Sequence, residues 1–218
     1  MLVLVGLTLT LAACGTQTDA RVSDTASAAA SVESTPSTAP SDAAAAPSEA
    51  APSEAGPSAP AGAFVSVDCA SGQQTGSDTA PKGTMVDGVT AALNASGVPT
   101  ITVPAAGTPA QTLGTADLVP GSGPAATAAD VLTVDYCGVG LGSKALFDSS
   151  WQHGSPATFP LNGVIAGWQQ GVPGMKAGGT RLLVIPGSLA YGSNPPPGSG
   201  IGTDETLIFV VTLRSISK

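Results

Sequence analysis

The sequence predicts an α+β fold, in which a C-terminal domain of antiparallel strands with one short helix follows a long disordered arm. The composition divides the 218 residues into two unlike parts, since seven of the eight aromatic residues follow residue 130. Residues 1–130 carry two basic against eleven acidic residues, whereas residues 131–218 carry five against four. Short apolar segments typical of strands begin after about residue 114. A compact core is therefore expected towards the C-terminal end.

The charges and the few metal-ligating residues exclude several classes of function. The chain has no basic run that could bind a phosphate backbone, which argues against nucleic-acid binding. One His and three Cys are too few for a zinc-finger array or an iron–sulfur protein. We therefore expect neither a metal nor another cofactor.

The first segment predicts export and a lipid anchor. Leu2–Ala13 is a run of twelve uncharged, mostly apolar residues, too short for a bilayer span of about 20 residues but typical of a signal peptide. It ends in Leu-Ala-Ala-Cys, which resembles a bacterial lipobox, so residues 1–13 are interpreted as a signal peptide and Cys14 as the lipidated residue. The chain would then be lipid-anchored on the extracytoplasmic face of the cell membrane. The alternative is an ordinary signal with a chance Cys, and because no Lys or Arg precedes Leu2, we expect the true start upstream.

Residues 14–62 are predicted to be a disordered tether. Residues 25–60 contain 13 Ala, 8 Ser and 6 Pro among 36 positions. Such a segment buries too little apolar surface to offset the entropy of ordering. The alternative, a Pro-rich motif that binds a partner, is less favoured because no PxxP with a basic flank occurs.

Residues 63–111 form an extension of uncertain structure. Phe64–Val67 and Thr100–Val103 are candidate strands, but the sequence leaves open whether this region folds alone or lies across the C-terminal domain. Cys69 and Cys137 could pair in an oxidising exterior, or could remain two small unpaired hydrophobic residues.

The elements of the C-terminal domain, residues 112–218, follow in order. Pro160 cannot donate a ladder hydrogen bond, so the strand that contains it should lie at an edge or at a bulge. Val164–Val172 has apolar residues at helical spacing, and Pro173-Gly174 should end that helix. Strands are expected over residues 131–137, 157–161, 180–185 and 206–213.

Two further patterns receive structural interpretations. Gly138, Gly140 and Gly142 have the spacing of a dinucleotide-binding loop, but the residues that follow do not begin a helix, so they are interpreted as turn glycines. Trp151–Gly154 is interpreted as an exposed loop, and no role is assigned to its His153.

Six segments together resemble the FKBP family of peptidyl-prolyl cis/trans isomerases, in the family's order and near its spacing. The resemblance covers about residues 112–218. It implies a five- or six-stranded antiparallel half-barrel wrapped around the short helix, with an apolar pocket for a proline ring. The segments are Val134-Asp135-Tyr136, Leu146–Ser150, Val164–Trp168, Gly171–Met175, Leu189–Gly192 and Thr206–Phe209.

The same resemblance assigns the site residues. Trp168 would form the floor of the pocket under the prolyl ring. The Ile165 N–H and the Tyr191 hydroxyl would donate hydrogen bonds to substrate carbonyls, and Asp148 would be the lone carboxylate at the rim. The expected catalytic residues are Tyr136, Asp148 and Tyr191, and the expected substrate-binding residues are Phe147, Phe159, Val164, Ile165, Trp168, Ile201 and Phe209.

These residue types suit isomerisation of X–Pro bonds. The barrier near 20 kcal/mol comes from amide resonance, so no bond is broken and no nucleophile is required. A dry aromatic pocket favours the twisted amide, which has less charge separation than the planar amide. Proline-containing peptides and unfolded exported proteins are the expected partners, and macrolide inhibitors are possible ligands.

Other interpretations remain open at this point. The aromatic residues could be core, and Asp148 could cap a turn. The domain could bind proline-bearing partners without catalysis, or act as a structural module of an envelope complex. Two departures from the family pattern, Ala157 at a wall position and Pro195–Pro197 in the flap, could shift peptide preference and macrolide affinity.

Overall fold

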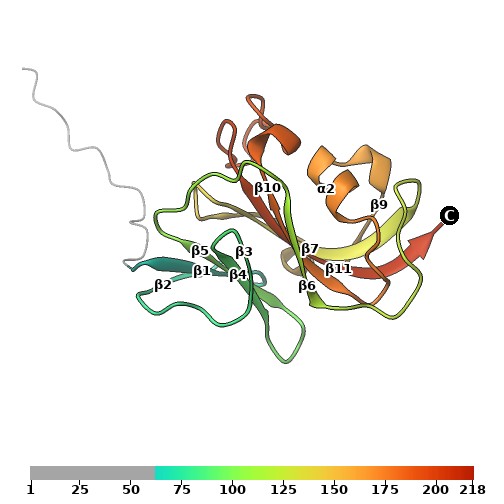
Figure 1. Cartoon of the computed structure of the whole chain (residues 1–218), viewed down its shortest axis with the longest axis horizontal. Coiled ribbons are helices and arrows are strands. Elements are labelled where there is room, and N and C mark those ends of the chain that lie inside the picture. Colours follow the sequence, from blue (N-terminus) through green and yellow to red (C-terminus); the bar gives the residue numbers. More distant parts are fainter. Residues whose placement is uncertain (1–61) are drawn as a thin grey trace, which may run out of the picture. The chain divides into compact units, whose positions relative to one another are not determined.

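The computed structural model describes residues 62–218, which form two antiparallel β-sheets and two short α-helices (Figure 1). The predicted signal peptide, the tether up to residue 61 and Cys14 lie outside the described residues. No helix in the described part is long and apolar enough to span a bilayer.

The C-terminal sheet has six strands and curves around one helix, as the sequence predicted. Its order is β6-β10-β11-β7-β8, and β9 pairs with β7 beyond that path. The helix α2, Ala166–Gly171, lies on one face of the sheet (Figure 1). The strands are β6 (Gly114–Val119), β7 (Val131–Gly140), β8 (Leu146–Ser149), β9 (Ala157–Pro160), β10 (Thr180–Ile185) and β11 (Leu207–Ser217).

The central strand β11 is buried on both faces because alternate side chains point to opposite sides of a strand. Ile208 and Val210 belong to one hydrophobic core, whereas Leu207, Phe209 and Val211 belong to another. This double burial explains why the segment reads as a nearly continuous apolar run rather than a clean alternation.

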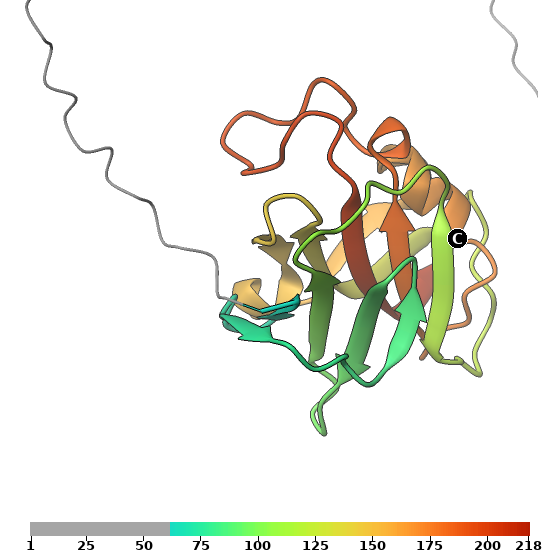
Figure 2. The same cartoon turned by 60° about the vertical axis from the view of Figure 1, so that its left-hand side comes forward.

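The second sheet, built from residues 64–104, covers the face of the C-terminal sheet opposite to α2 (Figure 2). Its order is β2-β1-β5-β4-β3, so the two expected strands are neighbours at its centre. The question that the sequence left open is therefore answered, since this extension packs across the C-terminal domain. The strands are β1 (Phe64–Asp68), β2 (Gln74–Ser77), β3 (Thr84–Val86), β4 (Val89–Leu93) and β5 (Pro99–Pro104).

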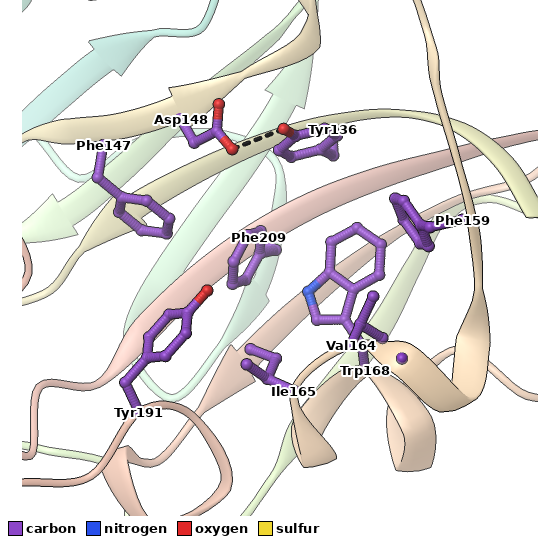
Figure 3. Close-up of a pocket in the computed structure, with 10 residues that line it drawn as sticks. Tyr136, Phe147, Asp148, Phe159, Val164, Ile165, Trp168, Tyr191 and Phe209 are labelled. Carbon is purple, nitrogen blue, oxygen red and sulfur yellow. Dashed lines mark hydrogen bonds between the residues drawn. The ribbon is translucent and has the colours of Figure 1, made fainter. Parts of the chain in front are cut away.

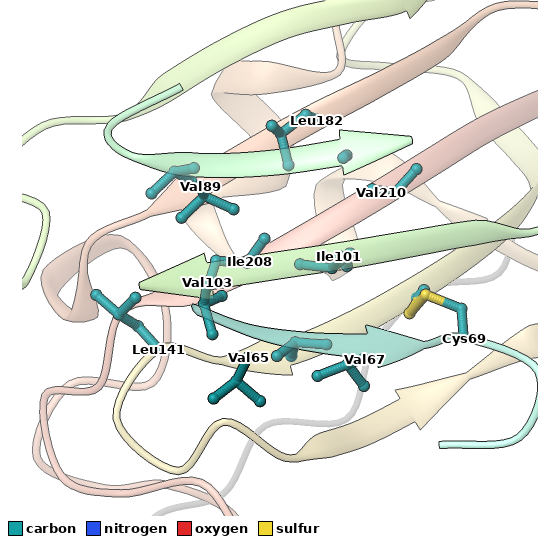
Figure 4. Close-up of a cluster of buried hydrophobic side chains, with 14 residues drawn as sticks. Val65, Val67, Cys69, Val89, Ile101, Val103, Leu141, Leu182, Ile208 and Val210 are labelled. Atoms are coloured by element: carbon teal, nitrogen blue, oxygen red, sulfur yellow. A yellow bond between two sulfur atoms is a disulfide. The ribbon is translucent and has the colours of Figure 1, made fainter. Parts of the chain in front are cut away.

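The core between the two sheets consists of small aliphatic side chains that interdigitate (Figure 4). Val67, Ile101 and Val103 from the N-terminal sheet are fully buried, as are Ile208 and Val210 from the C-terminal sheet. This shared core makes the two sheets one packing unit.

A disulfide between Cys69 and Cys137 joins the two sheets covalently across a sequence separation of 68 residues (Figure 4). Cys69 directly follows β1, and Cys137 lies in the middle of β7. Both residues are fully buried in the shared core. The bridge therefore stabilises the same interface that the aliphatic side chains form.

Two local predictions were wrong. The predicted helix over residues 164–172 is shorter, because Val164 and Ile165 have extended backbone and are preceded by a 3-10 turn, Leu161–Gly163 (η1). Residues 151–153 are helical rather than loop, within α1, Ser150–His153, which ends at Gly154 with φ 74°. Glycine adopts this left-handed conformation without steric cost, so it ends the helix there.

Candidate active site

A cavity of about 290 Å³ opens between the curved C-terminal sheet and α2 (Figure 3). Its walls are mostly aromatic and aliphatic, with few polar groups, as is usual for a ligand pocket. The lining residues are Tyr136, Phe147, Asp148, Phe159, Gly163, Val164, Ile165, Trp168, Tyr191 and Phe209.

The pocket collects side chains from most elements of the C-terminal domain. Tyr191 follows the 3-10 turn Gly187–Leu189 (η2) and approaches from the side opposite to Tyr136 and Asp148 (Figure 3). Val164 and Ile165 are available to line the cavity because their backbone is extended and the helix begins only after them. The other lining side chains come from α2 and from strands β7, β8, β9 and β11.

Trp168 forms the centre of the aromatic wall. It is 4% exposed and makes edge-to-face contacts with Tyr136, Phe159 and Phe209 at centroid distances of 5.9, 5.4 and 5.2 Å. Phe147 in turn packs edge-to-face on Phe209 at 5.4 Å. These interlocked rings hold the pocket open in one shape, because each edge-to-face pair disfavours rotation of its members.

Two glycines allow this packing. A Cβ at Gly138 would lie 2.5 Å from Phe147 and 2.9 Å from Phe209, so the sheet must be bare beneath these rings. A Cβ at Gly167 would lie 2.3 Å from Ile185, so glycine lets α2 approach the sheet closely. Any larger residue at either position would displace a wall of the pocket.

The polar groups are concentrated at one rim. The Tyr136 hydroxyl donates a 2.6 Å hydrogen bond to Asp148 Oδ2. Burial and the neighbouring Asp148 raise the pKa of Tyr136 well above its ordinary value, and burial and Asp148 also raise the pKa of Tyr191. Both phenols therefore keep their protons and can act as hydrogen-bond donors at neutral pH.

Two further polar groups lie near the pocket. His153 Nε2 lies 3.7 Å from Asp148 Oδ1, a contact that is ionic only while the imidazole is protonated. The sequence interpretation missed this neighbour, because the contact depends on the turn of α1 that brings residue 153 back. The carbonyl of Ile165 accepts bonds from the N–H groups of Trp168 and Gln169, while its own N–H bonds to no other described residue.

Most of the residues expected at the site meet in this cavity. Ile201 is an exception, since it lies outside the lining, half-buried against the same hydrophobic cluster. Gly163 was missed, because a residue without a side chain leaves no chemical signal. Pro195–Pro197 do not line the cavity. Among residues 62–218, no group of three His, Cys, Asp or Glu could hold a metal ion.

Comparison with known proteins agrees with this geometry. The family model for FKBP-type peptidyl-prolyl cis-trans isomerase matches residues 123–214. The FK506-binding protein of Streptomyces anulatus is 45% identical over 112 residues, which cover 50% of this chain and 90% of that protein. The chain belongs to the FKBP family.

Two other FKBP relatives match the same half of the chain. A probable FK506-binding protein of Corynebacterium glutamicum is 47% identical over 100 residues, covering 45% of this chain and 82% of that protein. Outer membrane protein MIP of Legionella longbeachae is 41% identical over 98 residues, covering 45% of this chain and 41% of that protein. The FKBP domain of this chain is a peptidyl-prolyl cis-trans isomerase.

Proposed function

We propose that X–Pro bonds rotate in the cavity of about 290 Å³, with the prolyl ring resting on Trp168. The observation that carries this assignment is the meeting of Tyr136, Asp148, Trp168 and Tyr191 at one cavity, from four separate segments of the chain. A ring-lined niche of this size suits a five-membered apolar ring better than a charged ligand.

The proposed mechanism is preferential binding of the twisted amide. Twisting the C–N bond removes resonance and reduces charge separation, so the twisted form loses less than the planar form on leaving water. The interlocked rings around Trp168 supply this dry environment. Catalysis then follows because the pocket binds the transition state more tightly than either ground state.

Polar groups at the rim would orient the peptide. The Ile165 N–H, which bonds to no other residue within 62–218, and the protonated Tyr191 hydroxyl are the proposed donors to substrate carbonyls. Asp148, whose Oδ2 accepts a 2.6 Å hydrogen bond from the Tyr136 hydroxyl, would orient the surroundings of the rotating carbonyl from the rim. Such fixed dipoles cost no reorganisation during the reaction.

A protease-coupled assay on short X–Pro peptides tests this function. Asp148→Ala and Trp168→Ala should each lower kcat/KM by at least about tenfold, as expected for losing a group that contacts the transition state. Met85→Ala, at a position 57% exposed on the N-terminal sheet, is the matched control and should match the wild type. Wild-type rates equal to those of the two pocket variants, with peptide binding retained, would instead identify a non-catalytic binding or chaperone module.

We propose that the enzyme assists folding of exported proteins while anchored to the extracytoplasmic face of the membrane through Cys14. The apolar run before Cys14 supports this, together with the name of one relative, outer membrane protein MIP. The proposed organisation is a signal peptide (1–13), a tether (14–62), an extension (63–111) and the isomerase domain (112–218). Metabolic labelling with palmitate should mark the full chain, and Cys14→Ala should abolish both the label and membrane fractionation; an unlabelled wild type would refute the anchor.

A further inference from the structure

We infer that Glu205 is a positioning residue for the isomerase pocket, because its carboxylate ties together two loops that adjoin pocket-lining residues. One loop is the flap, residues 192–206, which leads into β11. The other is the turn, residues 141–145, which joins β7 to β8; both lie at the same end of the C-terminal sheet (Figure 2). The inference rests on the proposed function of the pocket.

The carboxylate accepts three backbone hydrogen bonds. Glu205 Oε1 accepts from the N–H groups of Gly142 at 2.9 Å and Ser143 at 2.7 Å, and Oε2 accepts from the N–H of Gly202 at 2.6 Å. Each of these bonds is charge-assisted, and such bonds are roughly twice as strong as neutral ones. One side chain therefore holds both the turn and the flap.

This contact begins where the β-sheet ladder stops. Leu207 pairs with Gly140 in the β7–β11 ladder, and one more backbone bond joins the Leu141 N–H to the Thr206 carbonyl at 2.9 Å. Beyond that bond the two backbone segments diverge into the turn and the flap. The Glu205 carboxylate then supplies the acceptors that a backbone partner would have supplied, and so extends the connection past the end of the sheet.

The glycines of the turn make room for this carboxylate. A Cβ at Gly140 would lie 2.4 Å from Glu205 Oε1, and one at Gly142 would lie 3.1 Å from it. Gly140 and Gly142, which the sequence pattern assigned only to a turn, are therefore also explained by the space that the Glu205 carboxylate needs. Burial alone would raise the pKa of Glu205, but the N–H donors of Gly202, Ser143 and Gly142 outweigh it and lower that pKa.

Both tied loops lead directly into the pocket. Gly202 follows Ile201, which packs against the pocket cluster, and the turn runs into β8, which carries Phe147 and Asp148. Glu205 itself does not line the cavity. We call the three hydrogen bonds that Glu205 accepts from Gly142, Ser143 and Gly202 the clamp. Losing the clamp should loosen the pocket walls that bind the peptide without removing any group that contacts the rotating bond.

The test compares Glu205→Ala and Glu205→Gln with Asp204→Asn. The Asp204 side chain accepts no hydrogen bond among the described residues, so its variant removes a neighbouring charge without touching the clamp. In the protease-coupled assay, Glu205→Ala should raise KM about fivefold with kcat within about twofold, the pattern of lost uniform binding. Glu205→Gln, which keeps one acceptor oxygen, should fall between Glu205→Ala and the wild type, and Asp204→Asn should match the wild type.

Amide hydrogen exchange supplies a readout independent of activity. The N–H groups of Gly142, Ser143 and Gly202 should exchange at least about tenfold faster in the Glu205 variants, while amides of the β7–β11 ladder keep their protection. If Glu205→Ala fails to fold, Glu205→Gln decides the outcome.

The inference is overturned if an active wild type and both Glu205 variants share the same KM, if kcat alone falls, or if the three amides exchange alike in all proteins. An inactive wild type would refute the proposed function instead, and faster exchange at the three amides would then still identify the clamp.

Discussion

The two faces of the C-terminal sheet are built from the same strands but have different roles, since one lines a cavity and the other packs against the second sheet. On the face towards α2, rings and a carboxylate surround an open cavity of about 290 Å³. On the other face, the second sheet packs on the strands through a core of buried aliphatic side chains. Neighbouring residues such as Ile208 and Phe209 on β11 therefore contribute to different tasks.

This difference has a physical reason. A cavity costs stability because the atoms that line it lack packing partners on one side. The layer formed by residues 64–104 buries additional aliphatic surface behind the pocket, which offsets that cost and stiffens the sheet that carries the pocket walls. One face can then remain partly unfilled and still keep a single shape.

The largest expected effect is on the covalent link behind the pocket. Cys69→Ala/Cys137→Ala should lower the free energy of unfolding by about 4 kcal/mol, because the bridge closes a loop of nearly 70 residues. Chemical denaturation measures this loss, and kcat/KM of the folded protein should stay within about twofold. A loss of kcat/KM much larger than twofold in the folded double variant would show that the core behind the pocket also determines the activity.

A pair of neighbouring substitutions on β11 sharpens the comparison. Ile208→Ala and Phe209→Ala should each cost about 3 kcal/mol of stability, since both side chains are almost fully buried. Only Phe209→Ala should lower kcat/KM, by at least about tenfold, because only Phe209 lines the cavity. Melting curves and the peptide assay on both variants give the result; equal kinetic losses would contradict the division of labour.

A smaller effect is expected at the rim. Tyr136→Phe keeps the ring against Trp168 but removes the hydroxyl that donates to Asp148. One hydrogen bond is worth about 1 kcal/mol, so kcat/KM should fall about threefold to fivefold and the melting temperature by a few degrees. An unchanged kcat/KM would mean that Asp148 needs no fixed orientation.

The smallest effect is the acid sensitivity of the flap end. Because the folded pKa of Glu205 lies below its ordinary value of 4.5, its charge stabilises the fold fully above pH 4.5 and ceases to do so as the pH falls through the folded value. The melting-temperature difference between wild type and Glu205→Gln should therefore shrink below pH 4.5. A difference between the two proteins that is constant with pH would show that the charge is unimportant.

Much of the C-terminal domain could be predicted from local sequence. The strand and helix segments have their own periodicity, and Pro160 does lie in β9, a strand that pairs only with β7. The order of Tyr136, Asp148, Trp168 and Tyr191 along the chain was sufficient to name most of the lining residues, through the resemblance to FKBP proteins. Two short-range predictions were wrong: the loop at residues 151–154 is helical, and α2 begins later than Val164. Over so few residues, tertiary contacts override weak helical propensity in either direction.

The sequence by itself determined the antiparallel α+β domain, its family resemblance and the residue types of the pocket, since these follow from local periodicity and ordered motifs. Only the tertiary structure decided that residues 64–104 cover the back of the sheet, that Cys69 meets Cys137, that His153 lies near Asp148, and that Glu205 joins the flap to the turn. Cys137 lies 68 residues from Cys69 in the chain, and Gly142 lies 63 residues from Glu205. No local pattern specifies such partners, because they are selected by the packing free energy of the whole fold.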